Sequence, residues 1–213
     1  MLLGGKLLLM RTKVEGRTHP TKAKLLETVV ELLDQHPIEA ITLDQILEIS
    51  KVSKGSMYHH FADFDELIEL AEIKRFSAYV DLSIHKLTQA IMHSNSVAQL
   101  REELHKVTLA TQNPNLTVLR MDRVSAIART GKSERFQIAL GEEQQRLTDG
   151  ITEIVETGQD RGMVRTDLDA RAIAILIQAY TLGRIVDDIV EEKVDPDKWI
   201  HLIDAVADTI LVK

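Results

Sequence analysis

The sequence contains no cysteine among its 213 residues, and aromatic residues make up only 4% of the chain. Without cysteine the chain cannot form disulfides, thiolate zinc sites or iron–sulfur clusters, and it has no cysteine nucleophile. With so few aromatic residues the core must consist of Leu, Ile, Val and Ala, which favours packed helices over a β-sandwich. The ten glycines and four prolines are also few, which excludes a collagen-like chain and indicates a compact fold.

Long hydrophobic runs are missing as well. The most hydrophobic region holds an uninterrupted apolar run of only six residues, Ala172 to Ile177, whereas a membrane-spanning helix needs about 20. The start of the chain, Met1 to Met10, is apolar but lacks the cleavage site of a signal peptide, and Met10 is an alternative start. The sequence therefore predicts a cytoplasmic protein with no membrane partner.

The net charge of −7 is distributed unevenly along the chain. Residues 1–60 carry eight Lys and Arg against seven Asp and Glu, a net charge of +1, while residues 61–213 carry 18 against 26, a net charge of −8. We expect residues 1–18 to form a flexible basic arm and the N-terminal part to present an anion-binding face. The first 24 residues contain six basic residues and a single acidic one, Glu15. The basic residues are Lys6, Arg11, Lys13, Arg17, Lys22 and Lys24.

Apolar residues recur at three- and four-residue spacing from Thr21 onward, which predicts an all-α protein of about nine helices. Ser, Thr, Asp or Asn precede the expected first turns, and Gly or Pro follow the last ones. The expected helices run from Thr21 to before Pro37, from Thr42 for about nine residues, from Ser53 to about His59, from Asp63 onward, from Ser96 to before Asn113, from Pro114 to Gly131, from Ser133 to Asp160, from Asp167 to Val190 and from Pro196 to Leu211.

Two of the short helices are separated by the three-residue turn Ser50-Lys51-Val52. Ile46, Met57 and Phe61 are spaced so that they face inward from the two helices. This pattern is typical of a helix-turn-helix, whose second helix fits the DNA major groove, about 12 Å wide.

The polar residues left on the outside of this motif suit DNA. The N-terminus of the second helix offers hydroxyls, an ammonium group and free backbone amides to phosphate oxygens, and Gly55 adds no bulk where the backbone approaches the duplex. The alternative is an ordinary helical hairpin with a solvated lysine and an interior tyrosine. For His60 alone, the alternative to a phosphate contact is a buried, hydrogen-bonded histidine. The predicted DNA contacts are Thr42, Ser53, Lys54, Gly55, Ser56, Tyr58, His59 and His60, with Arg17 and Lys22 supplying phosphate contacts from the basic N-terminus.

Residues Val52 to Phe61 read V-S-K-G-S-M-Y-H-H-F, with T-L-D-Q-I at Thr42 to Ile46 before them and E-L at Glu66 and Leu67 after them. This combination resembles the TetR-like (tetracycline-repressor-type) family of transcriptional regulators. The resemblance implies a three-helix helix-turn-helix DNA-binding domain over residues 19–65 and a helical ligand-binding and dimerisation domain over residues 66–213. It also implies a repressor that binds palindromic double-stranded operator DNA as a homodimer and is released by a small-molecule effector.

Three residues depart from the family pattern. Lys51 stands where the family usually has glycine, so we expect a non-glycine residue in the left-handed conformation, at a cost of about 1 kcal/mol. Phe64 stands between Asp63 and Asp65 where a phosphate-binding lysine is common, and Leu47 replaces a usual alanine. We therefore expect one contact to the DNA backbone to be missing.

The expected helix from Asp167 to Val190 is apolar nearly all round, and the last helix carries a strong apolar stripe. A helix that is apolar all round is buried on more than one side, so we expect both helices to face their own core and a second subunit. The resemblance implies the same, and a dimer meets two half-sites about one DNA turn apart. The alternative is that both helices fill only one subunit's core. The predicted dimer-interface residues are Ile173, Ile177, Tyr180, Trp199, Ile203 and Ile210.

The resemblance further implies an effector site among the middle helices. Because Arg120 and Arg123 have apolar neighbours, they are candidates to bind an anionic group such as a carboxylate. The alternative for these arginines is surface pairing with Asp122 or with glutamates. The predicted ligand-binding residues are Leu104, Val107, Arg120, Arg123, Val124, Ile127 and Phe136.

One acidic cluster suggests a different class of function. Asp187, Asp188, Glu191 and Glu192 are spaced like the Mg²⁺-binding acids of all-helical isoprenoid synthases, so the alternative is a helical Mg²⁺-dependent enzyme. Such an enzyme needs a second acidic cluster facing the first, and none stands out, which favours a solvated helix end. Ser-His-Asp, phosphate-loop and dinucleotide-binding patterns are also missing. We therefore expect no catalytic residues, no metal and no cofactor.

Overall fold

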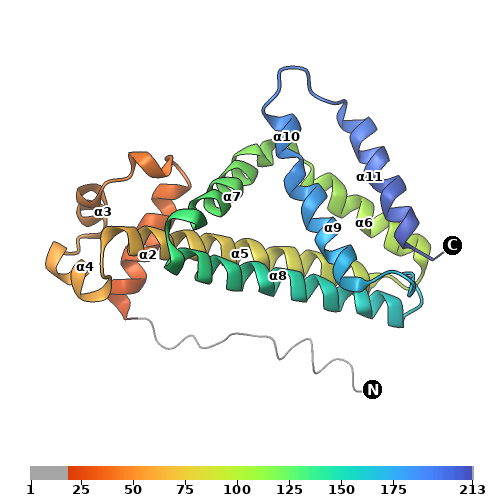
Figure 1. The fold of residues 1–213 in the computed structure, drawn as a ribbon, viewed down its shortest axis with the longest axis horizontal. Helices are drawn as coiled ribbons and strands as arrows, with labels where there is room; N and C mark the ends of the chain where they lie inside the picture. Colours follow the sequence, from red (N-terminus) through yellow and green to blue (C-terminus); the bar gives the residue numbers. More distant parts are fainter. Residues whose placement is uncertain (1–18, 213) are drawn as a thin grey trace. The chain divides into compact units, whose positions relative to one another are not determined.

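The computed structural model describes residues 19–212, which are almost entirely helical (Figure 1). This part of the chain holds nine α-helices of seven or more residues and one further single turn, α10, so the predicted all-α fold is confirmed. Its β-type pairing is confined to an isolated bridge between Val164 and Leu211. The helices are α2 (Pro20–Leu33), α3 (Leu43–Ser50), α4 (Lys54–His60), α5 (Phe64–His93), α6 (Val97–Thr111), α7 (Thr117–Arg129), α8 (Glu134–Asp160), α9 (Ala170–Gly183), α10 (Ile185–Asp188) and α11 (Pro196–Ile210), with 3₁₀ turns at Ile38–Ala40, Pro114–Leu116 and Thr130–Lys132.

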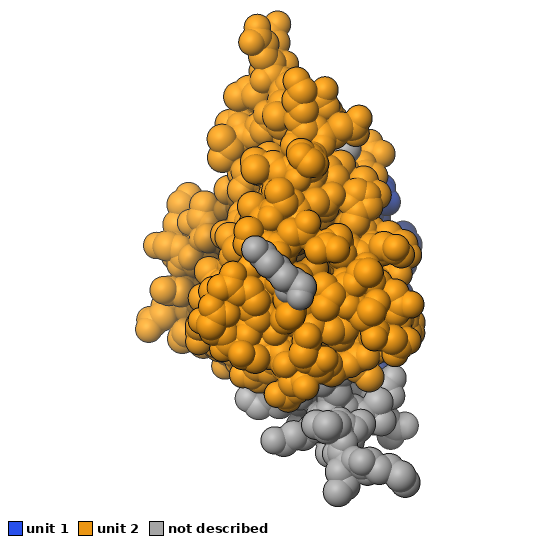
Figure 2. Space-filling model, turned by 90° about the vertical axis from the view of Figure 1, so that its right-hand side faces the viewer, with its two compact units in different colours: residues 1–72 blue, residues 73–213 orange. Residues whose placement is uncertain are grey.

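The chain divides into two compact units, Met1–Glu72 and Ile73–Lys213 (Figure 2). The boundary falls within α5, so this helix contributes residues to both units. The first unit extends past residue 65, where the sequence predicts the DNA-binding domain to end, because Leu67, Ile68 and Ala71 of α5 are buried in its core.

The first unit consists of α2, α3, α4 and the first turns of α5. Each helix contributes apolar side chains to one core, and burial of each large side chain stabilises the fold by about 1.5–3 kcal/mol. The large side chains with at most 2% exposure are Leu25 and Val29 of α2, Ile46 of α3, Met57 of α4, Phe61 after it and Leu67 of α5. This core fixes which faces of α3 and α4 remain exposed.

The predicted helix caps are confirmed at four places. The hydroxyls of Thr42, Ser53, Ser96 and Ser133 accept hydrogen bonds from the backbone amides three residues later, at 3.2–3.3 Å. Each cap satisfies an amide that has no partner within its own helix.

A reciprocal capping box starts α5. The Asp63 carboxylate accepts from the Glu66 amide at 2.6 Å, and the Glu66 carboxylate accepts from the Ala62 amide at 2.5 Å. Two backbone donors before the long helix are therefore satisfied together.

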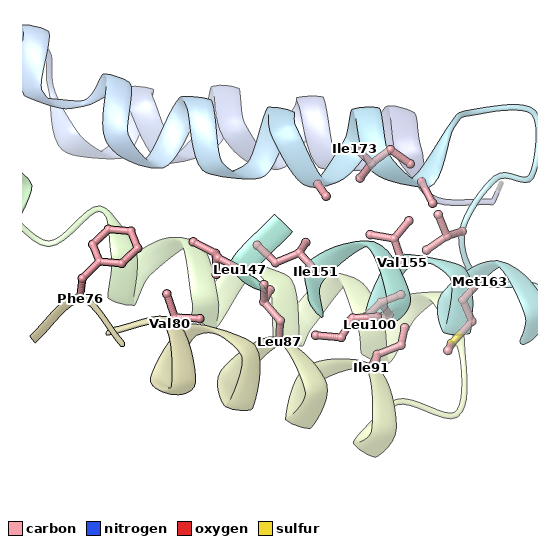
Figure 3. Packing of buried hydrophobic residues seen from close by; sticks show 14 of the residues in the cluster. Phe76, Val80, Leu87, Ile91, Leu100, Leu147, Ile151, Val155, Met163 and Ile173 are labelled. Atoms are coloured by element: carbon pink, nitrogen blue, oxygen red, sulfur yellow. The ribbon is translucent and has the colours of Figure 1, made fainter. Parts of the chain in front are cut away.

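In the second unit, α8 lies beside the part of α5 that follows residue 73 (Figure 1). Leu87 of α5 and Leu147, Ile151 and Val155 of α8 meet in the core, and Ile173 of α9 covers them (Figure 3). The two long helices approach closely at Gly150, where an added Cβ would lie 2.6 Å from Ile84 Cδ1. On the outside, α9 packs against α8 and α11 packs against α6.

The predicted helix from Asp167 to Val190 is wrong at both ends. The helix begins at Ala170, because Asp169 caps it by accepting from the Ala172 amide at 2.7 Å, while the Asp167 carboxylate pairs with Arg165 at 2.6 Å. The regular helix ends at Gly183, a residue of low helix propensity. The next turn, α10, stops at Asp188.

Candidate nucleic-acid interface and ligand cavities

The turn between α3 and α4 depends on a left-handed residue. Lys51 has φ 53° and ψ 32°, and it is the one non-glycine residue with positive φ among those the structure describes. The prediction that a lysine adopts this conformation is therefore confirmed. It ends α3 after only eight residues and redirects the chain into α4.

The helix α4 presents a polar face above an apolar base. Met57 and Phe61 are buried, whereas Lys54, Gly55 and Tyr58 are exposed, the last with 47% of its surface. A Cβ added at Gly55 would meet no atom within 4 Å, so the packing of the unit does not require glycine there. The exposed N-terminus of α4 suits the approach of a phosphate.

Histidines gather where the end of α4 meets the start of α2. The ring centroid of His60 lies 4.6 Å from that of His19 and 5.1 Å from that of His59. The ammonium group of Lys22 lies 5.2 Å from the centroid of the Phe61 ring, on the same side of the unit. Desolvation lowers the pKa of His60, and repulsion from His19, His59 and Lys22 lowers it further. A nearby phosphate would raise the pKa of His60, because its negative charge stabilises the protonated ring.

The other predicted DNA contacts are distributed as follows. Thr42, Ser53, His59 and the N-terminal turn of α4 are exposed in the first unit, while Ser56 and His60 are half-buried. The hydroxyls of Thr42 and Ser53 are also the caps of α3 and α4. Arg17 and the basic arm of residues 1–18 lie outside the described residues.

Two adjoining cavities lie in the second unit. The first, of about 100 Å³, is enclosed by α5, α6, α8, α9 and α11, and the second, of about 140 Å³, is enclosed by α5, α6, α7, α8 and α9. They share the side chains of Leu87, Val107, Ile151, Ile177 and Tyr180. Burial raises the pKa of Tyr180, and hydrogen bonds with Thr108, Thr181 and Thr111 partly offset this increase.

The predicted ligand-binding residues separate into two groups. Leu104 and Val107 line the first cavity, and Val107 and Arg123 line the second. Four others line neither cavity: Arg120 is buried in an ion pair with Asp188, Phe136 is a core residue, Ile127 is exposed and Val124 is half-buried. On α8 the sequence named Phe136 but missed the residues that line the cavities, whose spacing is that of an ordinary core helix: Leu147, Ile151, Ile154 and Val155.

The predicted dimer-interface residues lie mostly on the inner faces of their helices. Ile173, Ile177, Tyr180, Ile203 and Ile210 line the first cavity. Trp199 is half-buried and donates from Nε1 to the Gln112 side-chain oxygen at 2.8 Å. The exposed apolar residues of these helices that line neither cavity are Ala172, Ile175, Ala179 and Val186 on α9 and α10, and Leu202 and Ala205 on α11.

The acidic residues of the enzyme alternative have other partners. Asp188 pairs with Arg120 at 2.5 Å, and Asp187 pairs with Arg184 at 3.0 Å. Glu191 and Glu192 are exposed. In the described part of the chain, no three His, Asp or Glu residues are grouped so that they could hold a metal ion. No helix between residues 19 and 212 is long and apolar enough to cross a membrane.

Comparison with known proteins identifies the N-terminal unit. Residues 25–71 match the sequence profile described as "Bacterial regulatory proteins, tetR family". The HTH-type transcriptional regulator TtgR of Pseudomonas putida is 26% identical over 204 residues, which cover 89% of this chain and 91% of TtgR. The "Probable acrEF/envCD operon repressor" of Escherichia coli is 26% identical over 180 residues, which cover 81% of this chain and 77% of the repressor.

The fold of the chain is also found among solved structures. The reduced form of Escherichia coli NemR superposes with a TM-score of 0.64 at 18% identity, over 90% of this chain and 98% of NemR. The sequence relatives are transcriptional regulators, so they do not support the alternative of a Mg²⁺-dependent enzyme. Together with the left-handed turn and the exposed face of α4, these likenesses show that residues 25–71 match the TetR family of bacterial regulatory proteins and that the whole chain is similar to transcriptional regulators of that family.

Proposed function

We propose that this regulator represses transcription by binding palindromic operator DNA as a homodimer, and that a small molecule bound in the second unit releases it. The observation that carries the proposal is the exposed polar N-terminus of α4, held on a buried base of Met57 and Phe61 directly after the left-handed turn. Such a protein acts in the cytoplasm, on the chromosome.

In this proposal α4 enters the major groove. Lys54 supplies a positive charge, Ser53 a hydroxyl and Tyr58 a phenol, all of which bind phosphate oxygens or base edges. Gly55 lets the helix backbone approach the duplex. The basic residues before α2 add phosphate contacts, so operator affinity falls steeply as salt rises.

The second copy binds to the outer faces of α9 and α11. Ala172, Ile175, Ala179 and Val186 recur at helical spacing and are all exposed, with Ile175 exposed over 50% of its surface. Leu202 continues this apolar surface on α11, with 53% exposure. Apolar faces of this kind are covered by a partner in soluble proteins, and two helices from each copy form a four-helix interface.

The small molecule occupies the cavities among α5, α6, α8, α9 and α11. It releases DNA if it binds more tightly to a conformation in which the two recognition helices are wrongly spaced for the operator. Because α5 contributes residues to both units, a shift of this helix is one route by which binding changes the position of α4.

The DNA-binding proposal is tested by selecting fragments of the source genome with the purified protein at several salt concentrations. We expect one short palindrome, and each of Lys54→Ala and Tyr58→Ala should weaken binding to it by about tenfold or more while the dimer persists. Lys132→Ala removes an exposed lysine from the second unit and is the matched control. If neither Lys54→Ala nor Tyr58→Ala weakens binding, the proposed reading face is wrong.

The dimer is tested separately by analytical ultracentrifugation. Ile175→Asp and Leu202→Asp should each convert the dimer to monomers, because each places a charge in an apolar interface. Ile138→Asp is the control, because Ile138 is equally apolar and 59% exposed but lies on α8. A dimer that survives both α9 and α11 substitutions would show that the copies associate elsewhere.

A further inference from the structure

Arg123 of α7 is a buried cation without a counter-charge. Only 6% of its surface is exposed, and its guanidinium lies 4.1 Å from the ring centroid of Tyr79 and 5.7 Å from that of Phe76. Nη1 donates to the Tyr79 hydroxyl at 2.8 Å, whereas Nε has no hydrogen-bond partner. Among the described residues, no carboxylate lies within ion-pair distance of Arg123.

The neighbouring Arg120 shows what a paired arginine looks like in the same helix. It lies one turn earlier and is equally buried, but it binds both carboxylate oxygens of Asp188, at 2.5 and 3.0 Å. Its remaining donors reach the backbone carbonyls of Thr111 and Asn113. The fold therefore neutralises one of two buried arginines and leaves the other with two aromatic rings and a neutral hydroxyl.

An unpaired guanidinium is costly in such a place. Burial lowers the pKa of Arg123, and Tyr79 offsets this only in part, but an arginine side chain does not lose its proton in proteins. A buried charge normally needs a partner that is both charged and hydrogen-bonded. The described part of the chain does not supply such a partner to Arg123.

The surroundings of Arg123 can admit such a partner. Its side chain lines the second cavity together with polar groups of Tyr79, Lys86, Gln178 and Thr181. The first cavity, which adjoins it at Val107 and Tyr180, is lined almost entirely by aliphatic side chains. In the described part of the chain, no acidic side chain lines either cavity.

We propose that the ligand of this protein is an amphipathic anion, in which a carboxylate pairs with Arg123 in the second cavity and an apolar body occupies the first. A planar guanidinium binds both oxygens of a carboxylate, which gives the ligand a fixed orientation. Lys86, which is exposed at the second cavity, adds positive charge on the path of entry. The inference rests on the proposed function only in taking this ligand to be the effector.

The test compares three ligands with the same ten-carbon chain and different head groups: decanoate, decanol and decylamine. Binding to the full-length protein is measured by titration calorimetry, with the octyl and dodecyl homologues of each as a check on length. We expect decanoate to bind at least about tenfold more tightly than decanol or decylamine, as a charge-assisted hydrogen bond requires. Because this comparison uses the wild-type protein, its result does not depend on whether a variant folds.

The Arg123→Met variant then locates the anion site. It should lose the preference for decanoate, still bind decanol, and unfold at a temperature no lower than that of the wild type, because it removes an unpaired buried charge. Arg101→Met is the control: Arg101 is half-exposed and already paired with Asp208, so its loss should leave the preference intact. If Arg123 had a merely structural role, Arg123→Met would instead unfold at a lower temperature than the wild type and would keep the preference for decanoate.

Three outcomes would overturn the inference: equal or weaker binding of decanoate, a preference that survives in Arg123→Met, or no binding of any ligand in the three series. Operator binding is measured independently with the same samples. If the operator is bound but no carboxylate preference exists, the ligand inference alone fails. If carboxylates are preferred but no operator is bound, the regulatory function fails and the anion site stands.

Discussion

The buried ion pair between Arg120 and Asp188 should be worth several kcal/mol to the second unit. Both side chains are only 4% exposed, and Asp188 binds two nitrogens of the guanidinium, at 2.5 and 3.0 Å. Asp188→Ala leaves the Arg120 charge buried, with only the backbone carbonyls of Thr111 and Asn113 and the Thr117 hydroxyl as acceptors. Removing one partner of a buried pair destabilises proteins by about 3–5 kcal/mol. For a chain of this length that lowers the midpoint of thermal unfolding by about 10 °C.

Chemical denaturation and calorimetry of matched variants measure this effect. Asp167→Ala is the control, because Asp167 pairs with Arg165 at the surface, where an ion pair contributes little to stability. The double variant Arg120→Met/Asp188→Leu should recover most of the loss, because it leaves no unpaired charge. If Asp188→Ala is no less stable than Asp167→Ala, or if the double variant is as unstable as Asp188→Ala, the buried pair does not act as described.

The same pair predicts a dependence on pH. Desolvation opposes ionisation of Asp188, but hydrogen bonds and the charge of Arg120 outweigh it and lower the pKa of Asp188 below the ordinary value of 3.8. The folded state therefore binds fewer protons than the unfolded state near this pH, and the stabilisation is present above it. As the pH falls through the acid range, the difference in stability between the wild type and Asp188→Ala should shrink. A difference that stays constant from pH 7 to pH 3 would contradict the assignment.

Two further predictions concern the first unit. Lys51→Gly should raise the free energy of unfolding by about 0.5–1 kcal/mol, because relief of the left-handed strain exceeds the entropic cost of the glycine in the unfolded chain. Lys51→Ala keeps the strain and should give no such gain in the same denaturation experiment. Because the pKa of His60 is lowered from 6.5 by desolvation and by His19, His59 and Lys22, the folded state binds fewer protons than the unfolded one. The stability of the folded protein should therefore fall as the pH drops through about 6.5. His60→Gln should remove this part of the pH dependence of unfolding.

The local features of the fold were predictable because their signals span only a few residues. Thr42 and Ser53 cap their helices as the sequence indicates, since a hydroxyl and the amide three residues later meet wherever a helix starts. The left-handed conformation of Lys51 was predictable from the family resemblance, because the family usually has glycine at this position of the turn. The polar residues on α4 followed from the apolar spacing of Ile46, Met57 and Phe61.

The faces of α9 were not predictable in this way. A helix with apolar residues all round has no polar side to exclude, so spacing does not tell which residues meet the protein's own core. The structure turns Ile173 and Ile177 inward and leaves Ile175 outside. The sequence therefore predicted a helix buried on more than one side, and most of the residues it assigned to the dimer interface face the protein's own core. The outer residues are the ones on which the proposed dimer depends.

The two arginines of α7 show the limit of sequence reasoning most clearly. Arg120 and Arg123 lie three positions apart among similar apolar neighbours, and nothing in the sequence separates their roles. Their difference comes from Asp188, which lies 68 residues further along the chain and pairs with only one of them. Once that pairing is known, Arg123 is the buried cation that still needs an anion. Had Asp188 reached Arg123 instead, the same sequence pattern would point to the opposite residue as the ligand's partner.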